Sequence, residues 1–442
     1  MRLGLISPKG YVFGYKRKHA SVLGEYLKLG DLSPAAFISK NLSTALPTIA
    51  ALTPTDADIC IVDENCEPVD FDEPFDLVGI TVLTPLALRA YQIADAFRAR
   101  GVPVVIGGVH ATLLPEEARA HADTVFVGEA EETWPRFIAD FLSGRPQPFY
   151  KADGQVDLRT SPIPRYDLLQ DKAYKAICVQ ATRGCPHDCE FCSASKIYGR
   201  GYRRKTLEQV VEEIRLIKSL WPSPVINFTD DNLFVHQGFA RELVKALIPL
   251  NVRWTALTDV SVADDEELLD LMAEANCVSL FIGFETVTEK GLAHIDRHNW
   301  KLKQLEKYPT SIERIHSRGI GIFGAFIVGL DTDDLSTFKA IEDFIVENNI
   351  YRFQIVILIP FPGTRLRERL EREGRLLGND WGDYSGFDAT YIPKNMTPQE
   401  LEDNLFQLYH NLFVPEVERK RRAYFRQIQR NLYRRRLKGQ RA

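Results

Sequence analysis

Three cysteines, Cys185, Cys189 and Cys192, stand close together near the middle of this 442-residue chain. They follow an apolar run, Ala176 to Ala181, that predicts a β-strand, so all three thiols fall in one loop after that strand. Cubane iron-sulfur clusters normally take four thiolates, and three from one loop leave one iron open to another ligand. An open iron is typical of a catalytic site. We therefore predict that these cysteines hold a catalytic 4Fe-4S cluster.

A structural zinc site is the competing interpretation of the same cysteines. Zinc needs a closed tetrahedral set of ligands, and no second Cys or Cys/His pair stands at the spacing that would complete it. The other four cysteines, Cys60, Cys66, Cys178 and Cys277, are isolated, and we expect them to act as small apolar residues. An odd total of seven cysteines suits metal ligation in a reducing compartment better than a disulfide framework. We therefore expect a cytoplasmic protein.

Residues 1–148 predict an α/β domain. Short apolar runs alternate with stretches of helical periodicity, which is typical of a doubly wound, Rossmann-like parallel sheet. The predicted strands are Leu3 to Ile6, Ile59 to Val62, Leu77 to Leu83, Val102 to Ile106 and Thr124 to Val127. Ligands of such sheets bind beyond the carboxyl ends of the strands, so three strand-end segments should line one crevice. These segments are Thr81 to Thr84, Gly107 to Thr112 and Gly128 to Glu129.

A second β/α series predicts an incomplete barrel. Gly144 to Pro164 carries several Pro and Gly with little periodicity, which indicates a linker, placed at residues 149–172. Six strand and helix units follow, so residues 173–375 predict a partial (β/α)6 barrel, and residues 376–442 predict a helical extension. The predicted barrel strands are Ala176 to Ala181, Val225 to Phe228, Arg253 to Leu257, Val278 to Phe284, Gly321 to Val328 and Phe353 to Ile359. Thr206 and Gln209 form a capping-box pattern that predicts the start of the first barrel helix.

The motif around the cysteines resembles the signature of the radical S-adenosylmethionine (SAM) superfamily. That signature is C-x-x-x-C-x-aromatic-C, and Phe191 is the aromatic residue here. The resemblance implies a 4Fe-4S cluster whose open iron chelates SAM, which is cleaved reductively to a 5'-deoxyadenosyl radical that takes hydrogen from a substrate. It also implies that Asp230 and Asp231 hold the SAM amino group and that Glu285 bonds the ribose. The alternatives are a helix cap for the aspartates and a solvated strand end for Glu285.

Two weaker features accompany this resemblance. Pro362-Gly-Thr364 resembles the turn that packs near adenine, although any turn from strand to helix can use Pro-Gly. Arg200, Arg203 and Arg204 follow the cysteine loop, and two roles stay open for them. They either meet the SAM carboxylate or an anionic substrate, or they form a solvated basic face.

Asp76 to Glu131 resembles the cobalamin-binding domain found ahead of many radical SAM barrels. That domain carries Ser-x-Leu after its third strand and Gly-Gly after its fourth, and Thr81-Val-Leu83 and Gly107-Gly108 stand in these places. The resemblance implies cobalamin held by hydroxyl groups and by close approach of glycine backbone. The alternative is a Rossmann-like domain that binds no cofactor. The implied cobalamin contacts are Thr81, Thr84, Gly107, Gly108 and Gly128.

The histidine that binds cobalt in the wider cobalamin pattern has no counterpart in this sequence. The loop Asp-x-His-x-x-Gly would follow the first strand, where Ser7 to Phe13 stands without a histidine. We therefore expect cobalamin to bind without a protein imidazole at cobalt. His110 lies on the predicted Gly-Gly loop, and we expect it to have a structural role.

Charge is distributed unevenly along the chain. The formal net charge is −5, yet Arg419 to Arg441 contains eleven Lys or Arg and no acid, which leaves the rest near −16. Tyr424, Ile428 and Leu432 recur at four-residue spacing, so this basic tail predicts an amphipathic helix. Such a helix docks on the acidic body of its own chain, lies on an anionic membrane surface, or binds RNA phosphates, in that order of expectation. The most apolar run, Gly319 to Leu330, is short and glycine-broken, so we expect no membrane span.

Together the two resemblances imply a cobalamin-dependent radical SAM methyltransferase that acts at an unactivated carbon. A non-methylating enzyme of the same architecture, catalysing oxidative cyclisation or rearrangement, stays open, and so does a non-catalytic cobalamin sensor. A tRNA methylthiotransferase is disfavoured because Cys60 and Cys66 are too few to supply that class's additional cluster domain. The implied partners are a small-molecule or lipid-like substrate and an electron donor such as flavodoxin or ferredoxin, and we do not expect nucleic acid.

Overall fold

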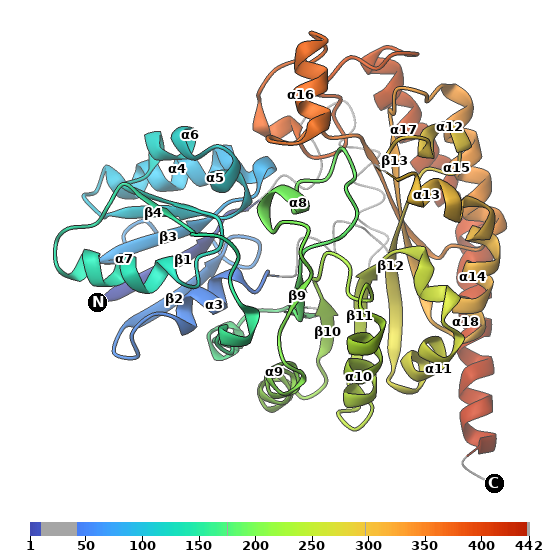
Figure 1. The fold of residues 1–442 in the computed structure, drawn as a ribbon, viewed down its shortest axis with the longest axis horizontal. Coiled ribbons are helices and arrows are strands. Elements are labelled where there is room, and N and C mark those ends of the chain that lie inside the picture. The colour runs from blue at the N-terminus through green and yellow to red at the C-terminus, as the bar shows by residue number, and fades with distance from the viewer. Residues whose placement is uncertain (10–41, 175, 297, 440–442) are drawn as a thin grey trace.

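The amino-terminal domain is built on a six-stranded parallel sheet (Figure 1). The computed structural model describes residues 1–9, 42–174, 176–296 and 298–439, and the side chains of the last helix up to Arg430. The strand order β2-β1-β3-β4-β5-β6 reverses direction between β1 and β3, which confirms the predicted doubly wound sheet. The strands are β1 (Arg2–Ser7), β2 (Asp58–Asp63), β3 (Leu77–Thr81), β4 (Val104–Gly107), β5 (Thr124–Val127) and β6 (Phe149–Lys151).

Helices cover both faces of this sheet because successive strand residues point to opposite sides. Leu5 belongs to a core with Leu46 and Trp134, whereas its neighbour Ile6 belongs to a separate core with Ala90. The first core lies under α3 and α7, and the second lies under α4, α5 and α6. These helices are α3 (Ala45–Ala51), α4 (Ala87–Arg98), α5 (Val109–Leu113), α6 (Pro115–His121) and α7 (Thr133–Leu142).

The strand β6 falls inside the segment that the sequence predicted to be a linker. It pairs in parallel with β5, and Tyr150 is buried and stacks on Phe126. The sheet therefore extends beyond the predicted boundary at residue 148. Only one of the three residues of β6 is buried, so this strand carries too little apolar pattern to be recognised from sequence.

The second domain is an open sheet of six parallel strands that neighbour one another in chain order. Right-handed crossovers between sequential strands place all the connecting helices on one face, so the sheet curves with its helices outside (Figure 1). Strands β7 and β14 are the free edges, as a partial (β/α)6 barrel requires. The strands are β7 (Ile177–Val179), β10 (Val225–Phe228), β11 (Arg253–Thr258), β12 (Cys277–Glu285), β13 (Gly321–Val328) and β14 (Arg352–Ile357).

Helices alternate with these strands as predicted. The capping box at Thr206 is present, because its hydroxyl accepts from the backbone N–H of Gln209 while the Gln209 side chain accepts from Thr206 N–H. The barrel helices are α8 (Ala194–Ile197), α9 (Leu207–Leu220), α10 (Gln237–Leu247), α11 (Glu266–Glu274), α12 (Glu289–Leu292), α13 (Trp300–Gln304), α14 (Tyr308–Ser317) and α15 (Leu335–Glu347). A short antiparallel hairpin of β8 (Thr182–Arg183) and β9 (Arg203–Arg204) lies at the base of the cysteine loop.

The carboxyl-terminal extension is helical, as predicted, and its last helix packs on the barrel. The extension contains α17 (Pro398–Phe413) and α18 (Pro415–Gly439), whereas α16 (Arg365–Arg372) follows β14 within the range predicted for the barrel. Arg421 of α18 is buried and donates to the carbonyls of Ile350 and Tyr351, and Phe425 stacks on Tyr351 at 4.7 Å. This is docking on the chain itself, the first of the three predicted roles for the tail. Among the described residues, we find no helix that is both long and apolar enough to cross a membrane.

Candidate active site between the two domains

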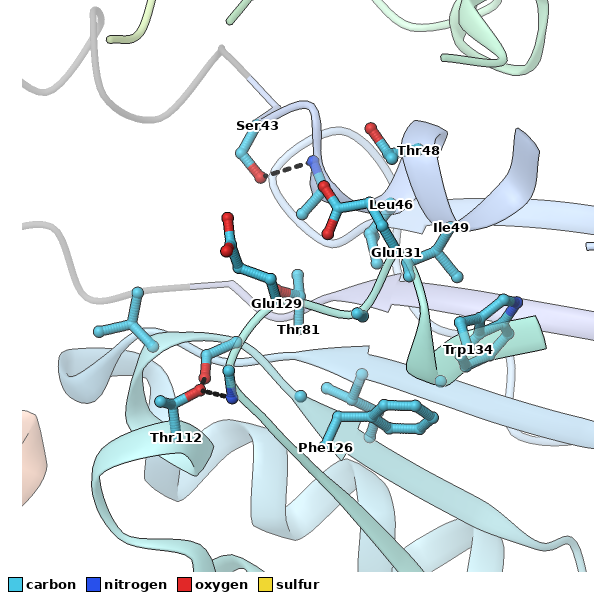
Figure 2. Close-up of a pocket in the computed structure, with 18 of the residues that line it drawn as sticks. Ser43, Leu46, Thr48, Ile49, Thr81, Thr112, Phe126, Glu129, Glu131 and Trp134 are labelled. Carbon is cyan, nitrogen blue, oxygen red and sulfur yellow. Dashed lines mark hydrogen bonds between the residues drawn. The ribbon is translucent and has the colours of Figure 1, made fainter. Parts of the chain in front are cut away.

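A cavity of about 250 Å³ lies at the carboxyl edge of the amino-terminal sheet (Figure 2). Thr81, Gly107, Gly108 and Gly128, at the ends of β3, β4 and β5, all line it. The structure therefore brings together four of the five residues predicted to contact cobalamin, at the edge where the strand-end rule places ligands.

The glycines keep this edge free of side chains. Gly108 has a φ of 98°, and a Cβ added there would lie 2.8 Å from the backbone nitrogen of Val82. Thr112 ties the glycine loops together, since its hydroxyl donates to the Gly108 carbonyl at 2.9 Å and accepts from the Gly128 N–H at 3.0 Å. Thr112 fell within the predicted strand-end segment but was not singled out from sequence, because nothing local shows which hydroxyl spans two loops.

The inner wall of the cavity is apolar and close to the core. Phe126 and Trp134 line it beside Leu46 and Ile49 of α3 (Figure 2). Gly79 also lines this wall, and a Cβ added there would lie 3.0 Å from the side chain of Leu5, so a larger residue would crowd the wall. A slot of this kind suits the flat, largely apolar base at the end of the cobalamin nucleotide tail. The residues present therefore fit cobalamin.

Thr84 and His110 do not line the cavity. Thr84 opens a short 3₁₀ helix whose next residue is Pro85, and its side chain is buried in the domain, so the structure does not bring it to the cavity with the other four residues, and its cobalamin contact stays a prediction. His110 is fully buried, with Nε2 at 3.0 Å from the Tyr91 hydroxyl and 3.3 Å from Glu117 Oε1. Burial lowers the pKa of His110. Its full burial and its contacts with Tyr91 and Glu117 agree with the predicted structural role.

The cysteine loop follows β8 directly, at the barrel edge that faces this cavity. Cys189 is buried, and Cys185 and Cys192 are half-buried. Burial raises the pKa of the Cys185 thiol to about 11, so a bound metal is needed to keep it ionised at neutral pH. No three Cys, His, Asp or Glu side chains of the described residues converge closely enough to hold one metal ion. In a cubane cluster each thiolate binds its own iron, so the cluster prediction does not require the three thiols to converge on one ion.

Polar contacts on both flanks fix the backbone of this loop. The Gly184 N–H donates to Asp231 at 3.0 Å, in a conformation with a φ of 92°. Three further contacts come from side chains within the loop. They join His187 to Asp259 at 3.0 Å, Asp188 to Arg365 at 2.7 Å and Glu190 to Arg369 at 2.8 Å.

The segment Pro362-Gly-Thr364 helps to hold the cysteine loop, because it fixes the start of α16, whose arginines bind that loop. Thr364 caps α16 by accepting from the backbone N–H of Arg367, and so fixes the first turn, which carries Arg365. Gly363 packs against the amino-terminal domain, where an added Cβ would lie 3.1 Å from the side chain of Leu113. These contacts give the turn a structural role, and nothing in the described structure tests the predicted proximity to adenine.

Asp230 has a different role from the one predicted. It is fully buried, and its carboxylate accepts from the backbone N–H groups of Ala181 and Thr182 and from the Thr182 hydroxyl at 2.6 Å. Burial raises the pKa of Asp230 to about 7. The shortest of these contacts all go to Oδ1, and the side chain is fully buried where β7 turns into β8, so no surface is left for SAM. The prediction that Asp230 holds the SAM amino group is wrong, because the strand below it needs the same acceptor.

Asp231 and Glu285 do lie at the cysteine loop. Burial raises the pKa of Cys192, and the carboxylates of Asp231 and Glu285 raise it further, which places both acids close to this thiol. Glu285 accepts from Lys301 at 2.8 Å, and Lys301 also donates to the Gly283 carbonyl at 3.0 Å. Neither the pairing with Lys301 nor the positive φ of 64° at Glu285 was recognised from sequence.

The remaining predicted residues either pack within the protein or lie on its surface. Phe191 packs partly buried against the main core. Arg203 binds Glu129, and Arg204 lies over the ring of Phe239. Arg200 is exposed, 3.6 Å from Asp188. Arg203 and Arg204 therefore have partners within the chain, and the anionic-ligand interpretation of the three arginines stays a prediction.

Comparison with known proteins agrees with this two-part site. The radical SAM superfamily model matches residues 179–345, and the B12 binding domain model matches residues 61–138. Bacteriochlorophyllide d C-12(1)-methyltransferase of Chlorobaculum tepidum is 30% identical over 383 residues, which cover 84% of this chain and 83% of that protein. The chain belongs to the cobalamin-binding radical SAM family. It is therefore a radical SAM enzyme whose family cofactors are a 4Fe-4S cluster, SAM and cobalamin, as predicted.

Two further comparisons concern one sequence relative and one solved structure. Hopanoid C-2 methylase of Rhodopseudomonas palustris is 29% identical over 349 residues, which cover 76% of this chain and 65% of that protein. The solved structure of the cobalamin-dependent SAM radical enzyme OxsB, with aqua-cobalamin and SAM bound, superposes with a TM-score of 0.70 at 14% identity. The match covers 96% of this chain and 70% of OxsB, so the fold is shared along nearly the whole chain.

Proposed function

We propose that this enzyme methylates an unactivated carbon of an apolar small molecule. The observation that carries the proposal is the makeup of the cavity wall. Besides the glycine loops, the cavity is lined by Arg183, Ile197 and Tyr198, which flank the cysteine loop on both sides. A group held in the cavity therefore borders the place where the cluster would bind. That proximity is what transfer of a methyl group to a radical site requires.

The residues of the chain divide the work of binding. When bound, the cluster with SAM supplies a hydrogen-abstracting radical, and cobalamin supplies the methyl group. Cys185, Cys189 and Cys192 would hold the cluster, and Asp231 and Glu285 would accept hydrogen bonds from SAM. Thr81, Gly107, Gly108 and Gly128 would hold cobalamin with Thr112, through the backbone contacts of their loops.

An apolar substrate is favoured by the rim of the cavity. Leu83 lines it and remains 53% exposed, so it adds apolar surface at the rim. Val109 and Ile197 line the same cavity. The relatives compared above are named for a bacteriochlorophyllide and a hopanoid, both large ring molecules with extensive hydrocarbon surface. We propose that this chain takes a substrate of the same general kind.

Isotope-labelled SAM separates this function from its alternatives. Anaerobically reconstituted protein is supplied with SAM labelled in its methyl group, a reductant and candidate ring substrates such as bacteriochlorophyllide d. Methylation should give S-adenosylhomocysteine together with 5'-deoxyadenosine, and the label should appear in the substrate. Deoxyadenosine without label transfer would instead support the non-methylating alternative. Absence of both products, with every substrate offered, would support the sensor.

The partners and location are part of the same proposal. Cleavage of SAM needs an electron, so a flavodoxin or ferredoxin is the proposed donor, and a reducing cytoplasm is the proposed compartment. Peripheral membrane contact remains a proposal for the far end of the basic tail, because the nearer part of α18 docks on the barrel. Deleting residues 431–442 should then reduce sedimentation with anionic vesicles, and salt should weaken the binding of the full chain.

A further inference from the structure

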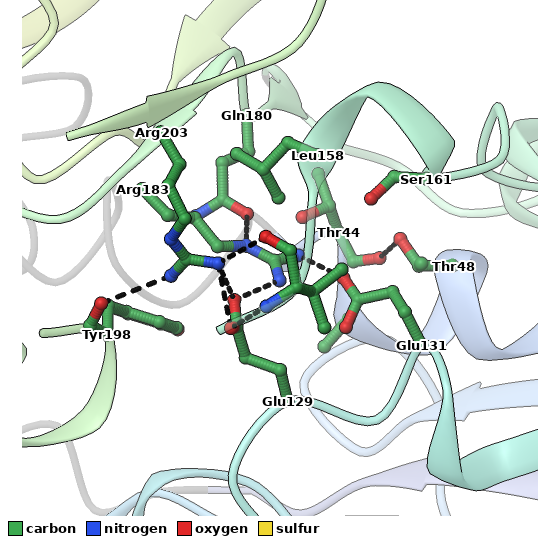
Figure 3. A network of polar contacts seen from close by, with 12 residues as sticks. Thr44, Thr48, Glu129, Glu131, Leu158, Ser161, Gln180, Arg183, Tyr198 and Arg203 are labelled. Carbon is green, nitrogen blue, oxygen red and sulfur yellow. Dashed lines mark hydrogen bonds and ion pairs between the residues drawn. The ribbon is translucent and has the colours of Figure 1, made fainter. Parts of the chain in front are cut away.

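Four charged side chains form a continuous network of ion pairs between the two domains (Figure 3). Glu129 and Glu131 come from the amino-terminal domain, and Arg183 and Arg203 come from the barrel hairpin. Arg183 contacts Glu129 and Glu131 at 2.6 Å each, and Arg203 contacts Glu129 at 2.8 Å. The linker joins the network as well, because the Val156 N–H donates to Glu129 at 3.0 Å and its carbonyl accepts from Arg203 at 2.7 Å.

Each member is one or a few residues from a part of the active site. Glu129 follows Gly128 of the cobalamin cavity, and Arg183 is separated from Cys185 by Gly184 alone. Arg183 and Arg203 are directly paired across the β8-β9 hairpin, which encloses the cysteine loop. A shift of the Gly128 loop relative to the cysteine loop would therefore break these contacts.

The network is buried, and burial decides what it can do. The side chains of Glu129 and Arg183 are 4% and 13% exposed. Burial alone would raise the pKa of Glu129, but hydrogen bonds from Arg183 and Arg203 hold that pKa below its ordinary value. Burying charges offsets much of what their attraction gains, so such networks are weak sources of stability and better sources of a defined geometry. Two acids and two arginines balance in charge, so removing the charge of one member leaves a buried partner without its counter-charge.

We infer that Glu129, Arg183 and Arg203 are positioning residues that fix the cobalamin cavity at a set distance from the cysteine loop. The inference rests on the proposed function for its purpose, because methyl transfer needs both cofactors at one substrate carbon. A displacement of about 1 Å at a reacting centre can cost about 100-fold in rate. A rigid connection therefore matters more here than in an enzyme whose chemistry uses a single cofactor.

The distance between the two paramagnetic centres tests this without any substrate. Holoenzyme carrying cob(II)alamin and the reduced cluster is measured by pulsed dipolar electron paramagnetic resonance, in which only molecules holding both centres contribute. Wild type should give a narrow distance distribution. Glu129→Gln keeps the size of the side chain but removes its charge, and the distribution should broaden about twofold as the domains sample other orientations. An unchanged distribution would overturn the inference.

Two further variants test whether the broadening comes from the loss of this connection between the domains. Arg203 does not line the cavity, so Arg203→Gln tests the same connection with the cobalamin wall intact, and it should broaden the distribution as well. Glu267→Gln is the matched control, because it breaks an exposed contact with Arg241 between α10 and α11, away from the domain boundary. Broadening in the control to the same extent would also overturn the inference.

The outcome does not depend on methyl transfer. If the wild-type protein transfers no label but Glu129→Gln broadens the distance distribution, the proposed function fails and the positioning role stands. Where transfer does occur, the ratio of deoxyadenosine to methylated product should rise about tenfold in Glu129→Gln, since radicals would form without the methyl donor in place. A variant that loses stability but keeps both the narrow distribution and the product ratio would show a structural role only.

Discussion

The two strand-end edges that meet at this site are built in different ways. On the amino-terminal sheet, Gly107, Gly108 and Gly128 leave an open cavity bounded by backbone. On the barrel, the acidic strand-end residues are already engaged by the chain, Asp230 with β7 and β8 and Glu285 with Lys301. One edge is shaped by the absence of side chains, and the other by charges whose partners come from distant segments. Substitutions should therefore act through shape on the first edge and through charge and metal ligation on the second.

The largest effect is expected on the barrel side, at the cluster itself. Cys189→Ala removes a buried thiol of the cysteine loop, so the reconstituted variant should form no stable cluster and SAM cleavage should fall below detection. Cleavage is measured as 5'-deoxyadenosine formed anaerobically with dithionite. Cys178→Ala is the matched control, because Cys178 is buried in β7 outside the loop, and its cleavage should resemble wild type. Normal cleavage by Cys189→Ala would refute the cluster assignment.

On the cavity side, Ala substitutions at two glycines distinguish the effect of backbone strain from the effect of a new side-chain contact. Gly108 and Gly101 both have positive φ, so Ala at either position should cost stability, about 1 to 3 kcal/mol, with the larger cost at Gly108, whose ψ of −173° lies in a region essentially restricted to glycine. Only at Gly108 does the new Cβ meet neighbouring atoms, whereas nothing lies within 4 Å at Gly101. Gly108→Ala should therefore weaken cobalamin binding about tenfold or more, with the cluster intact, while Gly101→Ala should bind normally. Equal cobalamin uptake by the two variants, measured by absorbance after gel filtration, would contradict the proposed site.

The same contrast explains what the sequence could predict. The glycines follow recognisable strands, and the rule that ligands bind at strand ends depends on local pattern alone, so four of the five predicted contacts line the cavity. Its apolar wall and the barrel residues beside it were not foreseen. The cysteine motif was equally local. The role of Asp230 was not, because it depends on the backbone of Ala181 and Thr182, about 50 positions earlier in the chain. The pairing of Arg183 with Glu129 crosses domains, and no spacing within either segment reveals it.

Asp230 and Asp231 give the next comparison, between neighbours with different expected roles. Asp230→Ala leaves buried N–H groups at Ala181 and Thr182 without an acceptor, so the free energy of unfolding should fall by about 2 to 4 kcal/mol. Asp231→Ala leaves only one buried N–H, that of Gly184, without an acceptor, so it should cost less, about 1 to 2 kcal/mol, while weakening SAM binding about tenfold. Urea unfolding of the purified proteins and equilibrium SAM binding to the reconstituted ones measure the two effects. The reverse assignment of effects would restore Asp230 as the SAM ligand.

The smallest expected effect concerns cobalt, where we predict no change at all. No histidine of the described residues lines the cavity, and the Nε2 of His110 is held by Tyr91 and Glu117.

A nitrogen bound to cobalt splits each cobalt line in the electron paramagnetic resonance spectrum of cob(II)alamin, into three lines for nitrogen-14 and two for nitrogen-15. Protein grown with nitrogen-15 histidine should therefore give the same spectrum as unlabelled protein. Labelling reports on all nine histidines, including the one outside the described residues, and it alters no contact in the fold. A triplet that becomes a doublet on labelling would show a protein imidazole at cobalt. An unchanged spectrum means that the domain holds cobalamin through its tail and ring edges, so the glycine-lined cavity alone must provide its affinity.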